Sequence, residues 1–432
     1  MKAAHTGPAA TLIGRVVDVR PAEMAGLIAA FAYNFLLFTA YYILRPLRDS
    51  MGVTSGVENL DDLFGFTLLG MLLAVPLFGW ISGRFRRAVF LPWVYGFFVL
   101  KLVAFWLLFR LLADDTWIAR VFFVWASVIN LFLVSVFWSF MADLFSKEQA
   151  GRMFAFIAGG ASTGAITGSA TTAFFAEAVG DINLLLISAA LLAVTIALMR
   201  YLLRWSARDA AGGERIQERA IGGNPFAGLR LVFSSGYLMG IAAFVFLMAA
   251  VTTFLYLQQA ALLKLHFPDG SERTAFLGKV DLTVNLIAVV LQLLAIGRLI
   301  RRFGVTAMLV AVPVVMIGGF LVLSVAPTLA VLVTVYIVRR VGQYGITRPA
   351  REILFTTLDR EAKYKAKNLI DTAVYRSSDF LVAKGHDAVV SALAATLSGI
   401  AWLGAGVAAV WAVVAFLLGR AHERMAAVKP PA

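Results

Sequence analysis

Cysteine is absent from the 432 residues, which excludes disulfides, thiol catalysis and thiolate metal sites. Charged residues are also scarce, at 15% against about 25% in ordinary soluble domains. Histidines number only four, and the sequence has neither a His-Glu-x-x-His motif nor a phosphate loop of the Gly-x4-Gly-Lys-Ser/Thr type. We therefore expect no metal, no cofactor and no enzyme.

Apolar residues dominate what remains. They make up 61% of the chain, and the mean hydropathy is +0.84. A soluble protein with so many apolar residues could not cover its surface with polar side chains. The apolar fraction is also far too high for a disordered chain. The apolar runs are also too continuous for an outer-membrane barrel, whose strands alternate over about ten residues. The composition predicts a lipid-embedded helical body.

Twelve stretches approach the roughly 20 apolar residues that a helix needs to cross a bilayer. They predict an all-α membrane protein with twelve transmembrane helices in two six-helix pseudo-repeats. The domains would be a tail (1–22), a bundle (23–203), a linker (204–236), a bundle (237–420) and a tail (421–432). The predicted spans are 24–44, 63–82, 88–109, 118–141, 153–177, 182–203, 237–258, 276–298, 305–325, 328–347, 368–392 and 400–419.

The basic residues are distributed unevenly between the predicted loops. With the N-terminus inside, 28 of the 38 lysines and arginines fall in inside loops and tails. This bias predicts that both termini are cytoplasmic in a multi-pass protein of the bacterial inner membrane. Insertion then explains most of the net charge of +13, so we expect the lipid bilayer as a partner and no nucleic acid. The first 22 residues lack a signal-peptide pattern, and we expect the first span to stay uncleaved.

The two halves of the chain repeat a loop motif. Residues 79–87 read GWISGRFRR and residues 297–304 read GRLIRRFG, an offset of 218 residues. These loops resemble the signature of the major facilitator superfamily, with Gly83 and Arg301 where its aspartate would stand. That resemblance implies two parallel six-helix halves with the substrate site between them. A G-x-S-x-G string at 160–164 lies inside a span, and we interpret its glycines as a helix-packing motif.

Charged side chains inside spans are expensive, so each should face a cavity or a partner. Lys101 lies in the middle of the third span, too deep to reach the interface easily. Arg45 and Arg48 end the first span beside Pro46, either as interfacial anchors or as a basic site. Asp371 and Arg376 could instead pair with neighbouring helices. Because basic residues outnumber acidic ones, the set favours an anionic substrate.

Three further stretches resemble the ATP/ADP translocases of plastids and intracellular bacteria. They read LRPLRD (44–49), FWSF with EQAGRMF (137–140 and 148–154), and LDREAKYKAKNLID (358–371) followed by Arg376; FLGK (276–279) is a weaker match. The resemblance implies exchange of adenine nucleotides. The family's essential charges would fall on Arg48 (where the family has lysine), on Glu148 or Gln149, and on Lys363, Lys365 and Lys367. Those lysines also fit the basic bias of any cytoplasmic loop.

The leading hypothesis is an alternating-access exchanger of ATP and ADP or a similar phosphorylated anion. Proton-coupled transport of another organic anion or solute, with Asp281, Asp371 and Asp379 carrying protons, is the second hypothesis. A membrane sensor that binds a ligand without transporting it is a remote third. We expect a monomer, because two halves already complete one cavity. The predicted substrate-binding residues are Arg45, Arg48, Lys101, Lys279 and Arg376. The predicted coupling or gating residues are Asp49, Glu148, Gln149, Asp281, Lys363, Lys365, Lys367, Asp371 and Asp379.

Overall fold

The computed structural model describes residues 18–84, 87–112, 114–208, 227–358, 360–393 and 396–428, and nearly all of them are helical. All twelve predicted spans are found as helices. In the N-terminal half these are α2 (Met24–Thr54), α3 (Leu60–Arg84), α4 (Arg87–Leu111), α5 (Thr116–Leu144), α6 (Lys147–Val179) and α7 (Leu184–Arg208), with short 3-10 turns η1 (Val57–Asn59) and η2 (Asp181–Asn183).

The C-terminal half begins with a short helix, α8 (Ala227–Ser234). Its long helices are α9 (Gly236–His266), α10 (Gly270–Leu294), α11 (Ile296–Val325) and α16 (Leu397–Val428). Two further spans are interrupted by π-helical turns. One runs through α12 (Leu329–Gly342), η3 (Gln343–Thr347) and α13 (Arg348–Leu354), and the other through α14 (Arg360–Leu369), η4 (Ile370–Val374) and α15 (Tyr375–Leu393). Within the described ranges, nine helices are long and apolar enough to cross a membrane.

Some helix ends differ from the predicted limits. Helix α2 continues to Thr54, ten residues past its predicted end, and Pro46 is accommodated inside it. The prediction stopped too early because Arg45, Pro46 and Arg48 resemble an interfacial helix end. At the other terminus, α16 extends to Val428, so the predicted tail begins as helix. The predicted first tail up to residue 17, most of the linker (209–226) and the last four residues lie outside the described residues.

Two large hydrophobic cores correspond to the two halves of the chain. One joins side chains from Leu27 to Leu202, and the other joins side chains from Val232 to Leu418. Two smaller clusters contain residues of both halves, such as Leu60 with Leu263 and Ile43 with Ala275. Each half therefore forms its own bundle, and the smaller clusters join the bundles.

A seam of glycines binds α6 to α2 inside the N-terminal bundle. A Cβ atom on Gly160 would lie 2.7 Å from the Phe31 carbonyl oxygen, and one on Gly164 or Gly168 would run into the carbonyl oxygen of Phe35 or Thr39. Only hydrogen fits at these positions, so the two backbones touch. The packing interpretation of the G-x-S-x-G string therefore agrees with the structure.

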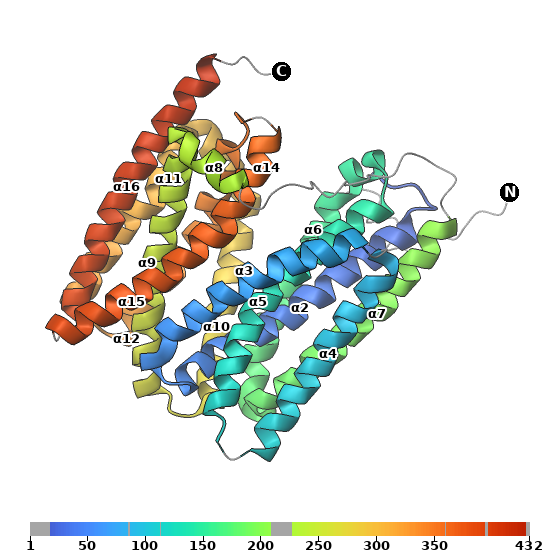
Figure 1. Cartoon of the computed structure of the whole chain (residues 1–432), viewed down its shortest axis with the longest axis horizontal. Helices are drawn as coiled ribbons and strands as arrows, with labels where there is room; N and C mark the ends of the chain where they lie inside the picture. The colour runs from blue at the N-terminus through green and yellow to red at the C-terminus, as the bar shows by residue number, and fades with distance from the viewer. Residues whose placement is uncertain are drawn as a thin grey trace.

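The two bundles lie against each other at one end and diverge toward the end that carries both termini (Figure 1). We call the first the sealed end and the second the open end. At the sealed end, Arg273 of α10 donates hydrogen bonds to Ser50 and Thr54 of α2 (2.9 and 2.6 Å). Lys384 of α15 pairs with Asp61 of α3 at 2.6 Å. Hydrogen bonds and ion pairs thus close one entrance to the space between the bundles.

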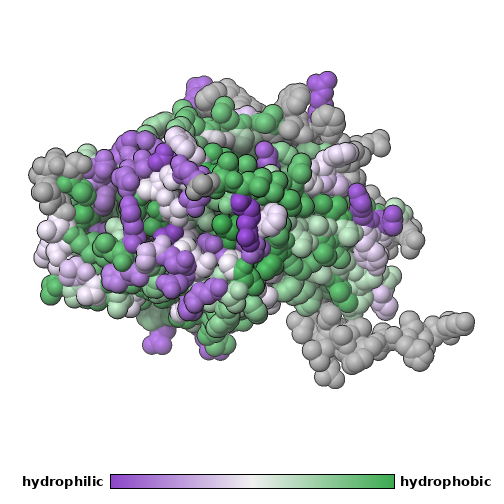
Figure 2. All heavy atoms as spheres, turned by 90° about the horizontal axis from the view of Figure 1, so that it is seen from below, coloured by the Kyte–Doolittle hydropathy of each residue, from purple (hydrophilic) through white to green (hydrophobic). Residues whose placement is uncertain are grey.

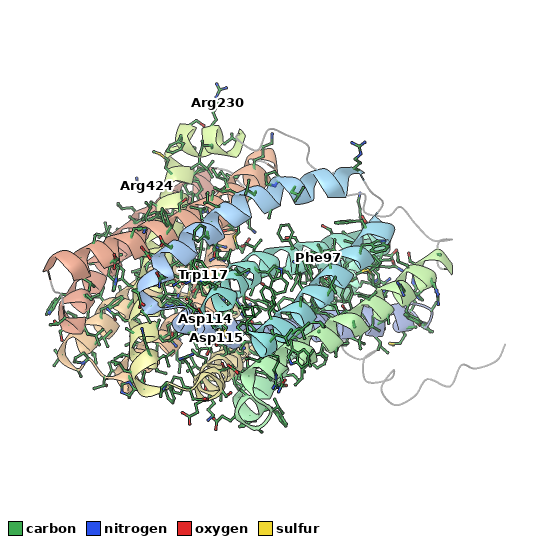
Figure 3. All side chains as sticks on the ribbon, turned by 60° about the horizontal axis from the view of Figure 1, so that its bottom comes forward. Phe97, Asp114, Asp115, Trp117, Arg230 and Arg424 are labelled. Atoms are coloured by element: carbon green, nitrogen blue, oxygen red, sulfur yellow. The ribbon has the colours of Figure 1, made fainter. Side chains whose placement is uncertain are left out.

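The surface of the molecule matches a helical body with polar ends. Seen toward the sealed end, hydrophilic side chains gather over the C-terminal bundle, with apolar surface around them (Figure 2). Acidic Asp114 and Asp115 lie at the sealed end, in the connection between α4 and α5, whereas Arg230 and Arg424 lie toward the open end (Figure 3).

Candidate functional site: an arginine-rich cavity between the bundles

A cavity of about 460 Å³ lies between the two bundles. That volume falls in the range of about 300–1,000 Å³ that is usual for small-molecule sites. Its walls come from α2, α3 and α5 of the first bundle and from α9, α12, α13, α15 and both π turns of the second. A molecule held there would touch both bundles, so its binding would be sensitive to their relative position.

Positive charge dominates the cavity wall. Among the lining residues that the structure describes are six arginines and three aspartates, an excess of three positive charges. The arginines are Arg45, Arg48, Arg339, Arg348, Arg351 and Arg376, and the aspartates are Asp49, Asp371 and Asp379. One guanidinium group can bind two oxygens of a phosphate or carboxylate at the same time. This wall therefore suits a multiply charged anion.

Aromatic side chains share the wall with the arginines. Tyr41, Tyr256, Tyr336, Tyr344 and Tyr375 line the cavity, together with Phe64 and Phe123. Such rings offer flat apolar surface for a ligand ring, and the tyrosines add hydroxyl groups. The cavity therefore combines surfaces for a charged group and for a planar group.

Asp281 of α10 lies between two arginines from different bundles. It accepts a hydrogen bond from Arg340 of α12, and Arg45 Nη1 of α2 lies 3.6 Å from its Oδ2. Arg340 is only 1% exposed and Asp281 4%. Because Arg45 belongs to the first bundle, this ion pair connects the two bundles, whereas the Arg340 contact stays inside the second.

A second carboxylate holds Arg48 in place. Arg48 Nη2 lies 2.5 Å from Asp49 Oδ1, and the Tyr256 hydroxyl of α9 donates to the same oxygen at 3.3 Å. Arg48 Nη1 reaches Ser127 Oγ of α5 at 3.5 Å. Groups of the first bundle therefore fix the guanidinium directly, and Tyr256 of the second bundle acts on it through Asp49.

The π turn η4 orients the acidic and basic groups of the eleventh span. Hydrogen bonds from i to i+5 place residues five apart on one face, so Asp371 and Arg376 both reach the cavity. An ideal α-helix would place these two residues on different faces. The sequence alone therefore did not show whether they share a face. Arg376 pairs with Asp379 at 2.9 Å, and Asp371 pairs with Arg351 of α13 at 3.1 Å.

Arg339 differs from the other buried arginines of the cavity. It is 4% exposed, and its Nη1 donates hydrogen bonds to Thr252 Oγ1 and Gln343 Oε1 at 2.6 and 2.7 Å. Its Nε has no hydrogen-bond partner, and no carboxylate of the described residues forms an ion pair with it. A buried charge without a counter-ion is unfavourable, so an anion bound next to Arg339 would be stabilised by it.

The π turn η3 positions Arg339 and its neighbours. It lies directly after α12, and Pro349 follows at the start of α13. Proline lacks the amide hydrogen that a regular α-helix would use there, so the helix must rearrange its bonding. Gln343, Tyr344 and Thr347 of this turn all line the cavity. Single π turns are frequent at functional sites.

Comparison with known proteins identifies the family. The model of the Major Facilitator Superfamily matches residues 24–358. The chain belongs to this superfamily. It is thus a multi-pass membrane transporter, as the loop motifs and the twelve spans predicted.

Two relatives of this facilitator are ADP,ATP carrier proteins from Chlamydia pneumoniae. Carrier protein 1 is 22% identical over 93% of the chain and 79% of the carrier, and carrier protein 2 is 21% identical over 100% and 96%. Solved structures with a similar fold include a bacterial homologue of the iron transporter ferroportin in an inward-facing state (TM-score 0.64, 14% identity, 92% and 98% of the two chains). The nucleoside transporter NupG is another (TM-score 0.58, 14% identity, 93% and 100%).

Six of the predicted site residues line the facilitator's cavity: Arg45, Arg48, Asp49, Asp371, Arg376 and Asp379. Asp281 adjoins it through Arg45. Lys101 does not reach it. This side chain is exposed on the outer face of α4, with its ammonium 5.5 Å from the ring of Phe97 (labelled in Figure 3). Lys279 is also exposed and lies 3.9 Å from Glu177. Depth along a helix can be predicted from the sequence, but the direction in which a side chain points cannot.

Glu148 and Gln149 lie at the open end, away from the cavity. Gln149 forms a capping box with Ser146 at the start of α6 and also binds Glu23, while Glu148 pairs with Arg20 at 2.8 Å. Arg152 lies 3.0 Å from Glu23. Burial alone would raise the pKa of Glu23, but the hydrogen bonds from Arg152, the Arg20 amide and Gln149 outweigh it, and the pKa is lowered.

The three lysines before the eleventh span also lie at the open end. Lys367 of α14 pairs with Glu352 at 2.5 Å, and its ammonium lies 5.9 Å from the Phe355 ring. Lys365 is on the same helix and is half-buried. The Lys363 side chain lies outside the described residues. Neither Lys365 nor Lys367 lines the cavity.

Arg339, Arg348 and Arg351 also line the cavity, and Arg340 binds Asp281 beside it, although none of the four is among the predicted site residues. Arg339 and Arg340 form a charged pair at the end of an apolar span, which is the signal that could have identified them. Arg348 and Arg351 stand near a cytoplasmic-type loop, where basic residues are expected for insertion alone, so the sequence does not distinguish them.

Proposed function

We propose that this transporter exchanges ATP and ADP, or a similarly phosphorylated anion, across the bacterial inner membrane by alternating access. The cavity supports this with its excess of three positive charges and its aromatic wall. The two similar proteins named ADP,ATP carriers support it independently. We place both termini in the cytoplasm, so the open end would admit cytoplasmic substrate.

Arg339 is the single observation that carries the proposal. It is buried on the cavity wall with hydroxyl and amide partners and without a carboxylate in the described part of the chain. A phosphate group would supply the missing charge, and a neutral or cationic cargo would not. Arg348 is exposed on the same wall, so its side chain is a second basic group that can bind the anion and move with it.

Exchange follows from the same excess of charge. To switch, the bundles must close the open end around the cavity and remove water from it. Burying an uncompensated ion costs several kcal/mol, roughly 10²-fold or more in population, so the empty protein would switch slowly. A bound anion neutralises the arginines and lowers this barrier. The binding site would therefore return to the first side of the membrane only with a counter-substrate bound, which is the behaviour of an antiporter.

Proteoliposome uptake tests the proposal. Labelled ATP would be supplied outside vesicles that are either empty or loaded with ADP, at equal pH on both sides. We expect uptake only into the loaded vesicles, and less uptake by Arg339→Met than by the matched surface variant Arg230→Met. In a second experiment with an imposed pH gradient, uptake into empty vesicles would instead favour proton coupling through Asp281, Asp371 or Asp379. No nucleotide uptake by protein of native melting temperature would remove nucleotides as the cargo.

A further inference from the structure

A second pocket, lined by different residues from those of the arginine cavity, lies at the sealed end. Its volume is about 470 Å³, close to that of the central cavity. Val57, Glu58 and Asp61 of the first bundle contribute to it, and residues of α9, α15 and α16 supply the remaining wall. A molecule in this outer pocket would therefore also touch both bundles.

Acidic side chains line the outer pocket, whereas basic side chains dominate the wall of the central cavity. Among the described residues that line the outer pocket are three carboxylates, Glu58, Asp61 and Asp387, and no lysine or arginine. Glu58 pairs with Lys264 and Asp61 with Lys384, so Asp387 is the lining carboxylate that has no ion pair among the described residues. The remaining lining is mainly apolar: Val57, Leu257, Ala261, Leu262, Ala383, Val390, Leu397 and Ile400. This combination suits a cation that carries an apolar group.

Two polar side chains of the outer pocket have unused hydrogen-bonding atoms. Gln258 is 2% exposed, and neither its amide nitrogen nor its amide oxygen has a partner within the part of the chain that the structure describes. His386 Nε2 is also buried without a partner. Leaving such groups unpaired is unfavourable, since a buried amide normally finds a donor and an acceptor. Gln258 in particular points to a ligand with at least one polar group.

We propose that the outer pocket binds an organic ammonium ion with an apolar body. The ammonium group donates hydrogen bonds to Asp387 and to the Gln258 oxygen, and the apolar body packs on the leucine and valine side chains. Because both bundles form the wall, the bound ligand favours the conformation in which this end is closed. The ammonium group could be carried by a free amine or by an aminophospholipid.

Binding can be measured without any transport assay, so the result does not depend on the proposed nucleotide exchange. The probe is 2-phenylethylammonium, and 2-phenylethanol is the uncharged control of the same shape. Titration calorimetry on the purified full chain should show saturable binding of the amine only. We expect Asp387→Asn and Gln258→Met to weaken it by about tenfold or more, because each removes a charged hydrogen bond. Asp114→Asn, an exposed aspartate at the same end, should leave it unchanged.

Phospholipid nanodiscs distinguish the two sources of the ammonium group. If the amine binds equally in phosphatidylethanolamine and phosphatidylglycerol discs, the ligand is a free amine. If phosphatidylethanolamine alone blocks it, the lipid headgroup occupies the pocket. The proposal would be overturned if Gln258→Met and Asp387→Asn bound the amine as tightly as the native protein. It would also be overturned if the native protein bound the alcohol as tightly as the amine. Asp387 is exposed, so Asp387→Asn is expected to fold even if the buried substitution Gln258→Met does not.

Discussion

At Gly278 of α10 the backbones of the two bundles are in direct contact, and this contact offers a test of how the sealed end is held closed. A Cβ atom there would lie 2.6 Å from the Ala173 backbone nitrogen of α6 and 3.0 Å from the Ala173 Cα. Backbone atoms cannot rotate away, so Gly278→Ala must push α10 from α6. Overpacking of this kind costs about 1–3 kcal/mol. We expect that penalty to fall on the conformation with the sealed end closed, because the contact between α6 and α10 belongs to it.

The expected result is a population shift of about 5- to 150-fold toward the conformation in which the sealed end is open. Because the chain has no cysteine, spin labels can be placed directly on Trp117→Cys of the first bundle and Leu265→Cys of the second, both exposed at that end. Double electron–electron resonance should show more of the longer distance in Gly278→Ala than in the native sequence.

Gly318→Ala is the matched control. Gly318 is also helical, and nothing lies within 4 Å of a Cβ placed on it. Both substitutions gain about 1 kcal/mol of helix propensity, so the difference between them isolates the clash. Identical distance distributions for the two variants would refute the argument that contact between α6 and α10 holds this end closed.

Three further predictions follow from other parts of the structure. Arg339→Met should weaken ATP binding about tenfold or more, because a charge-assisted hydrogen bond is worth about 1.5–3 kcal/mol, and calorimetry against Arg230→Met checks this. Gly164→Leu should abolish the folded protein, because its side chain would collide with the backbone of α2; size-exclusion chromatography would show aggregation. Glu23→Gln should lower the melting temperature near neutral pH. Since the folded-state pKa of Glu23 is lowered, its contribution is present above the ordinary glutamate pKa and is lost as pH falls through the folded value, so the difference between native and variant should shrink in acid. A difference that is constant with pH would contradict the role of the Arg152 pair.

The sequence was a sufficient guide to the helices because span length and hydrophobicity are local properties. Each predicted span corresponds to a helix, and the loop motifs at 79–87 and 297–304 led to the family that the comparison identifies. Arg45 and Arg48 were found because charge inside an apolar segment needs compensation. These features depend on residues that are close together in the chain.

Other parts of the site depend on information that is not local. Lys101 is as deep in its span as a cavity residue would be, yet rotation of α4 against its neighbours turns it outward. Asp371 and Arg376 share a face only because a π turn changes the register between them. The counter-ions of Arg340 and Arg351 come from other helices. Helix rotation and local bonding pattern are set by tertiary packing, so side-chain direction could not be predicted.

The glycine seam between α2 and α6 also determines which parts of the protein can move independently. With no side chain between their backbones, these two helices form one rigid body. Helix α10 contacts both of them, Gly278 against α6 and Arg273 against α2. We therefore expect relative motion of the halves where α10 meets this pair and where α15 meets α3, and not between α2 and α6. Small volume changes on α10 should alter the rate of conformational exchange, while the same changes on the outer helices α4 and α11 should not.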